Sequence, residues 1–224
     1  MDMMMNLFSV FDPATSLGMN LNWVAAILGM VLFPASKWGS ASRSMAFMDL
    51  IMGKLYKEMQ ALFSFKNKTV AVIFSALFLF VMFNNMMGLL PYIFTPTSHL
   101  AVSLSVALPL WLGYFSYGWV MSAKCMLAHL VPLGTPMMLM PFMVIIESVS
   151  SLIRPLTLAV RLMANMIAGH LLLTLISSAV SMESSLFLLG VIFMQVVLVI
   201  LEVAVAIIQS YVLVILSVLY SSEI

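Results

Sequence analysis

Two very long apolar segments near the carboxyl end constrain this chain more than any other feature. They run over residues 137–178 and 184–222, and each greatly exceeds the roughly 20 residues that cross a bilayer as a helix. At 1.5 Å per residue the second would be about 60 Å long, against a hydrocarbon core of about 30 Å. A straight helix of that length fits only if it is tilted by roughly 60° from the membrane normal. We therefore predict a long, steeply inclined antiparallel helical hairpin over residues 137–222.

The composition of the chain indicates that lipid is its main solvent. Of the 224 residues 64% are hydrophobic and 8% are charged, whereas soluble domains are about 45–50% apolar and about 25% charged. These values exclude an ordinary soluble enzyme and a disordered chain, and a net charge of +1 offers no basic surface for nucleic acid. The single cysteine, Cys125, excludes a disulfide framework and a cysteine-rich metal site.

Three further regions precede the hairpin. Residues 17–34 predict a first span, and residues 69–121 predict two spans that form a helical hairpin around a polar turn. Residues 44–65 predict an amphipathic helix that lies in the membrane interface. Its apolar face consists of Met48, Ile51, Met52, Leu55, Met59 and Leu62. The expected fold class is an all-α membrane protein with a single domain, residues 1–224, five crossings and one interfacial helix.

The basic residues predict the orientation of the chain. Seven of the nine lie after the first or the third span, so five crossings place all seven on the inner side, with the amino terminus outside. They are Lys37, Arg43, Lys54, Lys57, Lys66, Lys68 and Lys124. The 23 methionines are typical of a translation system that reads an isoleucine codon as Met, as animal mitochondria do, although Met3, Met4 and Met5 also allow a copper site. With no transit peptide expected, we predict the mitochondrial inner membrane, with the carboxyl terminus in the matrix.

Ionisable residues inside the hairpin are the candidates for function. They are Glu147, Arg154, Arg161, His170 and Glu202. Even insertion scales assign a cost of about 2.5–3.5 kcal/mol to a charge at mid-membrane, so such residues are retained for a reason. Spacings of seven, seven and four place the first three and Asn165 on one helical stripe, and Gln195, Glu202 and Gln209 form a second stripe on the partner helix.

An antiparallel register brings these stripes together. We expect Arg161 to face Gln209, and His170 to face Glu202 nearer the outer side. Glu147 would lie about 20 Å from Arg161 toward the inner side. Titratable groups on both sides of a cation that cannot release its proton predict two proton routes separated by Arg161.

Structural interpretations remain open for several of these residues. His170 could be a hydrogen-bonded interior histidine, and a structural role at a wet boundary is favoured for Arg154. Asn84 and Asn85 are expected to hydrogen-bond between helices, and His99 and His129 to lie at the interface. Small residues next to Arg161 predict a shallow face that a neighbouring helix could approach closely. They are Ala164, Asn165, Ala168 and Gly169.

Four stretches of the chain resemble one family. They are LAVRLMANMIAGHLLL at 158–173, FNNMMGLLPYIFTPTSHL at 83–100, AHLVPLGTP at 128–136 and QSYVLVILSVLYSSE at 209–223. Together they are similar to subunit a of F-type ATP synthases, and the opening NLFSVFDP resembles arthropod mitochondrial versions. The resemblance implies a stator subunit that conducts protons through two half-channels and couples their flow to rotation of a ring of c subunits. Other stator and accessory subunits and the lipid bilayer are its implied partners.

The same resemblance implies roles for individual residues. Arg161 matches the essential arginine, which keeps ring carboxylates ionised and blocks a direct proton leak. Protons would enter near His170 and Glu202 and leave near Glu147. Asn165 and Gln209 match positions that flank the arginine, whereas Arg154 matches no functional position. No active site, cofactor or metal is expected in the chain, and it has no GxxxxGK[ST] phosphate loop.

Two other classes of protein compete with this interpretation. A redox-chain subunit would bind haem or quinone, but His99, His129 and His170 lie in three separate contexts without evident partners. A haem-free optical spectrum would exclude the haem form. An ion antiporter would transport after reconstitution alone, whereas a stator subunit requires the ring.

Overall fold

The regular structure of this chain is helical wherever it is described. The computed structural model describes residues 10–14, 20–31, 42–62, 68–90, 93–131, 136–179 and 185–222. Within them the longer elements are α1 (Ala25–Val31), α2 (Arg43–Leu62), α3 (Lys68–Gly88), α4 (Leu100–His129), α5 (Met140–Ala179) and α6 (Ser185–Ser222), and the 3-10 turns include η3 (Leu21–Val24), η4 (Pro96–Ser98) and η5 (Met137–Leu139). Lys37, Lys66, the three methionines Met3, Met4 and Met5, and the turn between α5 and α6 lie outside the described residues.

Four described segments are long and apolar enough to cross a membrane. They are Val70–Gly88, Leu100–Lys124, Met137–Ser178 and Leu188–Leu219. The chain is therefore a multi-pass membrane protein with an all-helical fold. Of the expected first span, residues 17–34, the described part includes the seven-residue helix α1, so the fifth crossing remains a prediction.

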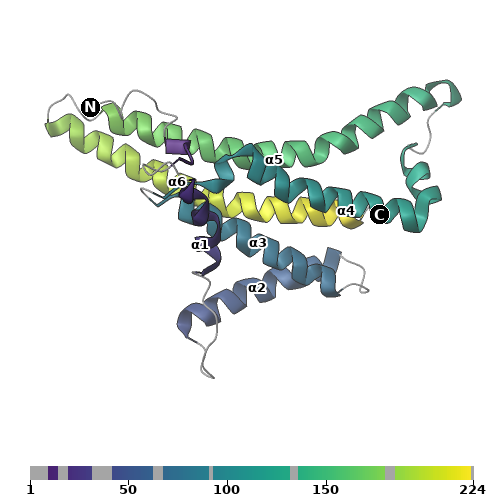
Figure 1. Cartoon of the computed structure of the whole chain (residues 1–224), viewed down its shortest axis with the longest axis horizontal. Coiled ribbons are helices and arrows are strands. Elements are labelled where there is room, and N and C mark those ends of the chain that lie inside the picture. The colour runs from purple at the N-terminus through teal and green to yellow at the C-terminus, as the bar shows by residue number, and fades with distance from the viewer. Residues whose placement is uncertain are drawn as a thin grey trace.

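The two long helices begin and end close to the predicted residues. Helix α5 has 40 residues and α6 has 38, and Figure 1 shows them side by side over part of their length before α5 changes direction. Pro155 lies inside α5. A proline inside a helix lacks the amide hydrogen for one backbone bond and its ring clashes with the preceding turn, which bends the helix.

Helix α4 continues past residue 121, the predicted end of its span. The chain leaves helical backbone angles at Ser122 (φ −146°, ψ 54°) and then resumes a helix that ends at His129. Lysine, methionine, leucine and alanine in this last part favour a helix, so the helix is longer than the predicted span.

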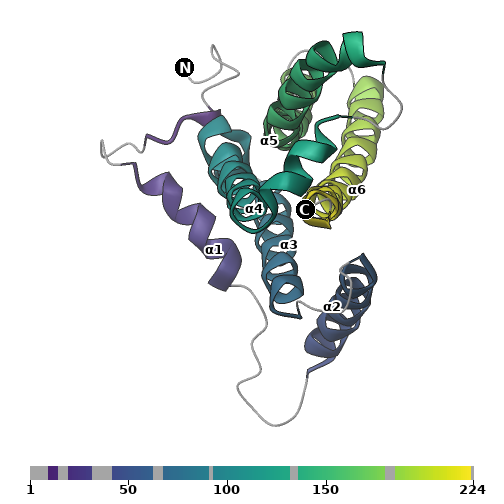
Figure 2. The ribbon, with the colours of Figure 1, turned by 90° about the vertical axis from the view of Figure 1, so that its right-hand side faces the viewer.

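The apolar core lies where α3, α5, α6 and α2 meet. Helix α3 has its most extensive contacts with α6, and α4 has its own with α5, so the two helices of residues 69–121 each pack mainly on the long hairpin. Figure 2 shows α3 and α4 between α1 and the α5–α6 pair. The central buried side chains are Phe74, Phe78, Leu158, Leu162, Leu213, Val214 and Val218.

Helix α2 packs its predicted apolar face against the bundle. Leu55 and Met59 are 7% and 1% exposed, and Ile51 and Met52 contact the same core. The face contacts α3 and α6. Away from this face Lys54 and Lys57 are exposed, and Glu58 at its edge accepts a hydrogen bond from the Tyr211 hydroxyl of α6 at 3.1 Å, so the amphipathic pattern in the sequence is confirmed.

Candidate functional site

A hydrogen bond between the two long helices defines their register. The Asn165 Nδ2 amide donates to Gln209 Oε1 at 3.0 Å, and Gln209 is 5% exposed. The expected partner of Gln209 was Arg161, so that expectation is wrong by one helical turn. Asn165 lies four residues further along the same stripe of α5. Its short amide side chain reaches Gln209 across the contact between α5 and α6.

Arg161 lies on an open face of α5. Its side chain is exposed, as are the small residues Ala164 and Ala168 on the same face. Among the described residues no hydrogen bond or ion pair of Arg161 is found. A permanent cation on an apolar helix is costly in lipid, so this face is suited to meet an anionic group carried by another chain.

Glu202 is buried between the two long helices against a glycine of α5. Its side chain is 8% exposed, and neither carboxylate oxygen has a hydrogen-bond partner among the described residues. A Cβ added to Gly169 would lie 2.8 Å from Glu202 Oε1. Glu202 therefore occupies space that only a glycine leaves free, a specific role that the pattern of small residues along α5 did not predict for Gly169.

His170 follows that glycine but does not form the expected pair with Glu202. Its ring contacts Phe11 edge to face, with centroids 6.2 Å apart, and its Nε2 atom is buried without a hydrogen-bond partner in the described part of the chain. Because Gly169, the neighbour of His170, lies against Glu202, the two residues are at the same level of the hairpin, as the register predicted. No hydrogen bond between them is found among the described residues.

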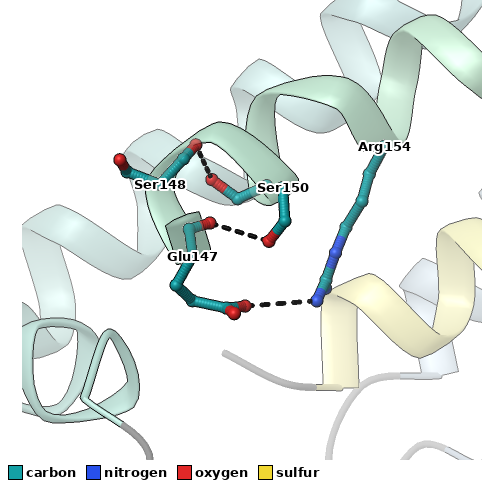
Figure 3. Close-up of polar contacts among 5 residues, drawn as sticks. Glu147, Ser148, Ser150 and Arg154 are labelled. Carbon is teal, nitrogen blue, oxygen red and sulfur yellow. Dashed lines mark hydrogen bonds and ion pairs between the residues drawn. The ribbon is translucent and has the colours of Figure 1, made fainter. Parts of the chain in front are cut away.

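An ion pair joins Glu147 to Arg154 on the first half of α5. Arg154 Nη2 lies 3.6 Å from Glu147 Oε1 (Figure 3), and the side chains are 31% and 37% exposed for the arginine and the glutamate. Both line a cavity of about 740 Å³ between α4, α5 and α6. Both residues lie on the predicted stripe of α5, but their contact was not predicted, although opposite charges two helical turns apart could have suggested it.

Buried polar side chains also gather where α1, α3 and η4 meet. The Asn84 side-chain amide donates to the Phe80 carbonyl of its own helix at 3.1 Å. This hydrogen bond lies within α3, whereas one between helices was expected. Both amide atoms of Asn85 and the hydroxyl of Thr97 are buried without a hydrogen-bond partner among the described residues. The His99 ring packs on Trp23 and Phe94.

Metal binding finds no support in the described residues, because no group of three or more His, Cys, Asp or Glu side chains there could hold an ion. The polar groups of the long hairpin are instead spread along it. Glu147 and Arg154 lie on the first half of α5, Arg161 and Asn165 near its middle, and Glu202 against its second half. Such an arrangement can pass a proton between separate positions and hold one fixed positive charge between them.

Comparisons with known proteins identify what this chain is similar to. The sequence profile of the ATP synthase A chain family matches residues 17–222. The chain is 52% identical over 225 residues to ATP synthase subunit a of Anopheles gambiae, with 99% of this chain and the whole of that protein covered. It is 51% identical over 223 residues to ATP synthase subunit a of Drosophila melanogaster, with the same coverage.

Proposed function

The chain belongs to the ATP synthase A chain family, and from this premise we propose the route by which it conducts protons. It is a proton-translocating subunit of the membrane sector, without catalytic nucleotide chemistry of its own. We propose that its partner is a rotating ring of c subunits and that the two surfaces meet at Arg161. The exposed position of Arg161 between small side chains carries this proposal.

Arg161 acts as a fixed counter-charge in this scheme. An ionised carboxylate on the ring is stable next to the guanidinium and must be neutralised before it moves into lipid. Because arginine does not release its proton at physiological pH, it also prevents a direct leak between the two sides. Ala164 and Ala168 leave room for a ring helix to approach α5 closely.

Protons reach and leave the ring by separate routes on either side of Arg161. On the outer side, Glu202 and His170 receive protons, supported by the buried and unpartnered carboxylate and Nε2 atoms. On the inner side, Glu147 releases them into the cavity between α4, α5 and α6. The bond between Asn165 and Gln209 lies between these routes and holds the two helices in register.

The lengths of the two long helices support a steep inclination in the membrane. With 38 residues, α6 is about 60 Å long and inclines steeply in a core of about 30 Å, and α5 lies beside it over part of its length. We place the chain in the mitochondrial inner membrane with five crossings, with α2 in the matrix-side interface and the amino terminus toward the intermembrane space. The exposed lysines of α2 then lie on the inner side.

A substitution at Arg161 tests the function. In the complete complex reconstituted into vesicles, Arg161→Ala is expected to abolish ATP synthesis driven by a proton gradient, because the ring carboxylate loses its counter-charge. Arg43→Ala, which removes a positive charge at the start of α2, is the matched control and should leave the rate near that of the unaltered complex. Synthesis by Arg161→Ala at the rate of this control would refute the mechanism.

A further inference from the structure

Arg154 has no place in the route described above, yet the structure gives it a specific partner. Residues seven apart on a helix differ by about 20° in direction and by about 10.5 Å along the axis. Two long side chains can bridge that distance, and Arg154 Nη2 reaches to 3.6 Å from Glu147 Oε1. Figure 3 shows the two side chains converging on the same space beside α5.

Other polar groups nearby do not compete for the Glu147 carboxylate. Ser148 and Ser150 donate their hydroxyl hydrogens to backbone carbonyls of α5 at 2.9 and 2.8 Å, and Ser151 does the same at 2.9 Å. Ser217, which faces the cavity from α6, donates to the carbonyl of Val214. Among the described residues, Arg154 is therefore the partner that orients this carboxylate.

The ion pair lies in a largely apolar setting. Apolar and aromatic side chains of α4 form much of the cavity wall, including Trp111, Phe115 and Trp119. Glu147 and Arg154 are the charged residues of the lining, and Tyr114 of α4 is its other titratable residue. In such a setting an unpaired charge is costly, so the ion pair neutralises both groups and also fixes where the Glu147 carboxylate lies.

We propose that Arg154 is a positioning residue, which holds the Glu147 carboxylate in the cavity between α4, α5 and α6. The inference rests on the proposed role of Glu147 in proton release. A free glutamate samples many rotamers, and proton transfer requires a heavy-atom separation of about 2.6–3.2 Å or one bridging water. The ion pair restricts the carboxylate to the side of α5 that faces the cavity, where it can pass protons toward the inner side.

A double-mutant cycle in the complete reconstituted complex separates positioning from packing. Arg154→Gln is expected to lower the rate of proton-driven ATP synthesis about three- to tenfold, while Arg154→Lys retains at least half of the original rate because one cationic donor suffices at this single contact. Once Glu147→Gln has removed the carboxylate, adding Arg154→Gln should cause no further loss. Arg43→Gln controls for the loss of one positive charge, and each rate is normalised to the amount of this chain in the complex.

Three outcomes would overturn the inference while leaving the role of Glu147 intact, provided that Glu147→Gln is itself impaired. These are a normal rate in Arg154→Gln, equal losses in Arg154→Lys and Arg154→Gln, and losses that multiply in the double variant. A normal rate in Glu147→Gln would instead refute the proposed release route, and the positioning role with it. Arg161→Ala tests the remainder of the proposed function separately.

Discussion

Replacing Gly169 with alanine should impair proton conduction with little effect on folding. In a helix interior, alanine is more favourable than glycine by about 1 kcal/mol. Against this gain, the new Cβ would lie 2.8 Å from Oε1, 2.9 Å from Cδ and 3.2 Å from Cγ of Glu202. Overpacking of this kind typically costs about 1–3 kcal/mol, so the net destabilisation is about 0–2 kcal/mol and assembly of the complex should survive.

The functional loss follows from where the strain is relieved. Ordinary contact begins at 3.4 Å, so the carboxylate must move by about 0.6 Å or adopt another rotamer. Misplacement of a reacting group by about 1 Å can cost about a hundredfold in rate, and a displacement of about 0.6 Å therefore predicts roughly a tenfold loss. A larger side chain, as in Gly169→Val, should cause a larger loss.

The assay is ATP synthesis by the reconstituted complex under an imposed proton gradient, normalised to the content of this chain. Gly113→Ala in α4 is the matched control, because a Cβ there would meet nothing within 4 Å. The reasoning would be refuted if Gly169→Ala synthesised ATP at the rate of Gly113→Ala. If the Gly169→Ala complex lacked this chain altogether, the small net destabilisation expected for the substitution would also be contradicted.

Two further predictions test the packing of the bundle. Phe74 is fully buried and stacks on Tyr114 with ring centroids 5.8 Å apart. Phe74→Ala should therefore destabilise the chain by about 3–5 kcal/mol, which would lower the midpoint of thermal unfolding in detergent. An unchanged midpoint would contradict the central position of Phe74 in the core. Cysteines replacing Gly169 and Glu202 should form a disulfide on mild oxidation, since a Cβ at Gly169 lies 3.2 Å from Glu202 Cγ. Cysteines replacing Gly169 and Gln209 should not form one. The opposite pattern on a non-reducing gel would disprove the register.

The sequence predicted the helices well because helix formation in lipid is a local matter. Without water in the bilayer core, backbone groups must bond within their own segment, so long apolar runs define helices directly. The expected segments 137–178 and 184–222 correspond to η5 with α5 and to α6, to within a few residues. The predicted end at residue 121 came too early, because the helix resumes after the irregular backbone at Ser122 and ends at His129.

Contacts between helices were predicted to within about one turn. Counting along an antiparallel hairpin placed Arg161 opposite Gln209, whereas Asn165 makes that hydrogen bond. The same count brought Glu202 to the level of His170, whose neighbour Gly169 makes the actual contact. A helical residue advances by 1.5 Å and about 100°, so a small change in crossing geometry selects a different partner.

The sequence determined the solvent of this protein, its long apolar helices and its family, and it predicted the few charged residues that are proposed to conduct protons. Only the tertiary structure decided which atoms meet: α3 on α6, Glu202 against Gly169, and Arg154 with Glu147. The physical reason is one of scale. Burial of apolar segments averages over many residues and can be read from composition, but a hydrogen bond or ion pair depends on fractions of an ångström that packing of the whole bundle sets.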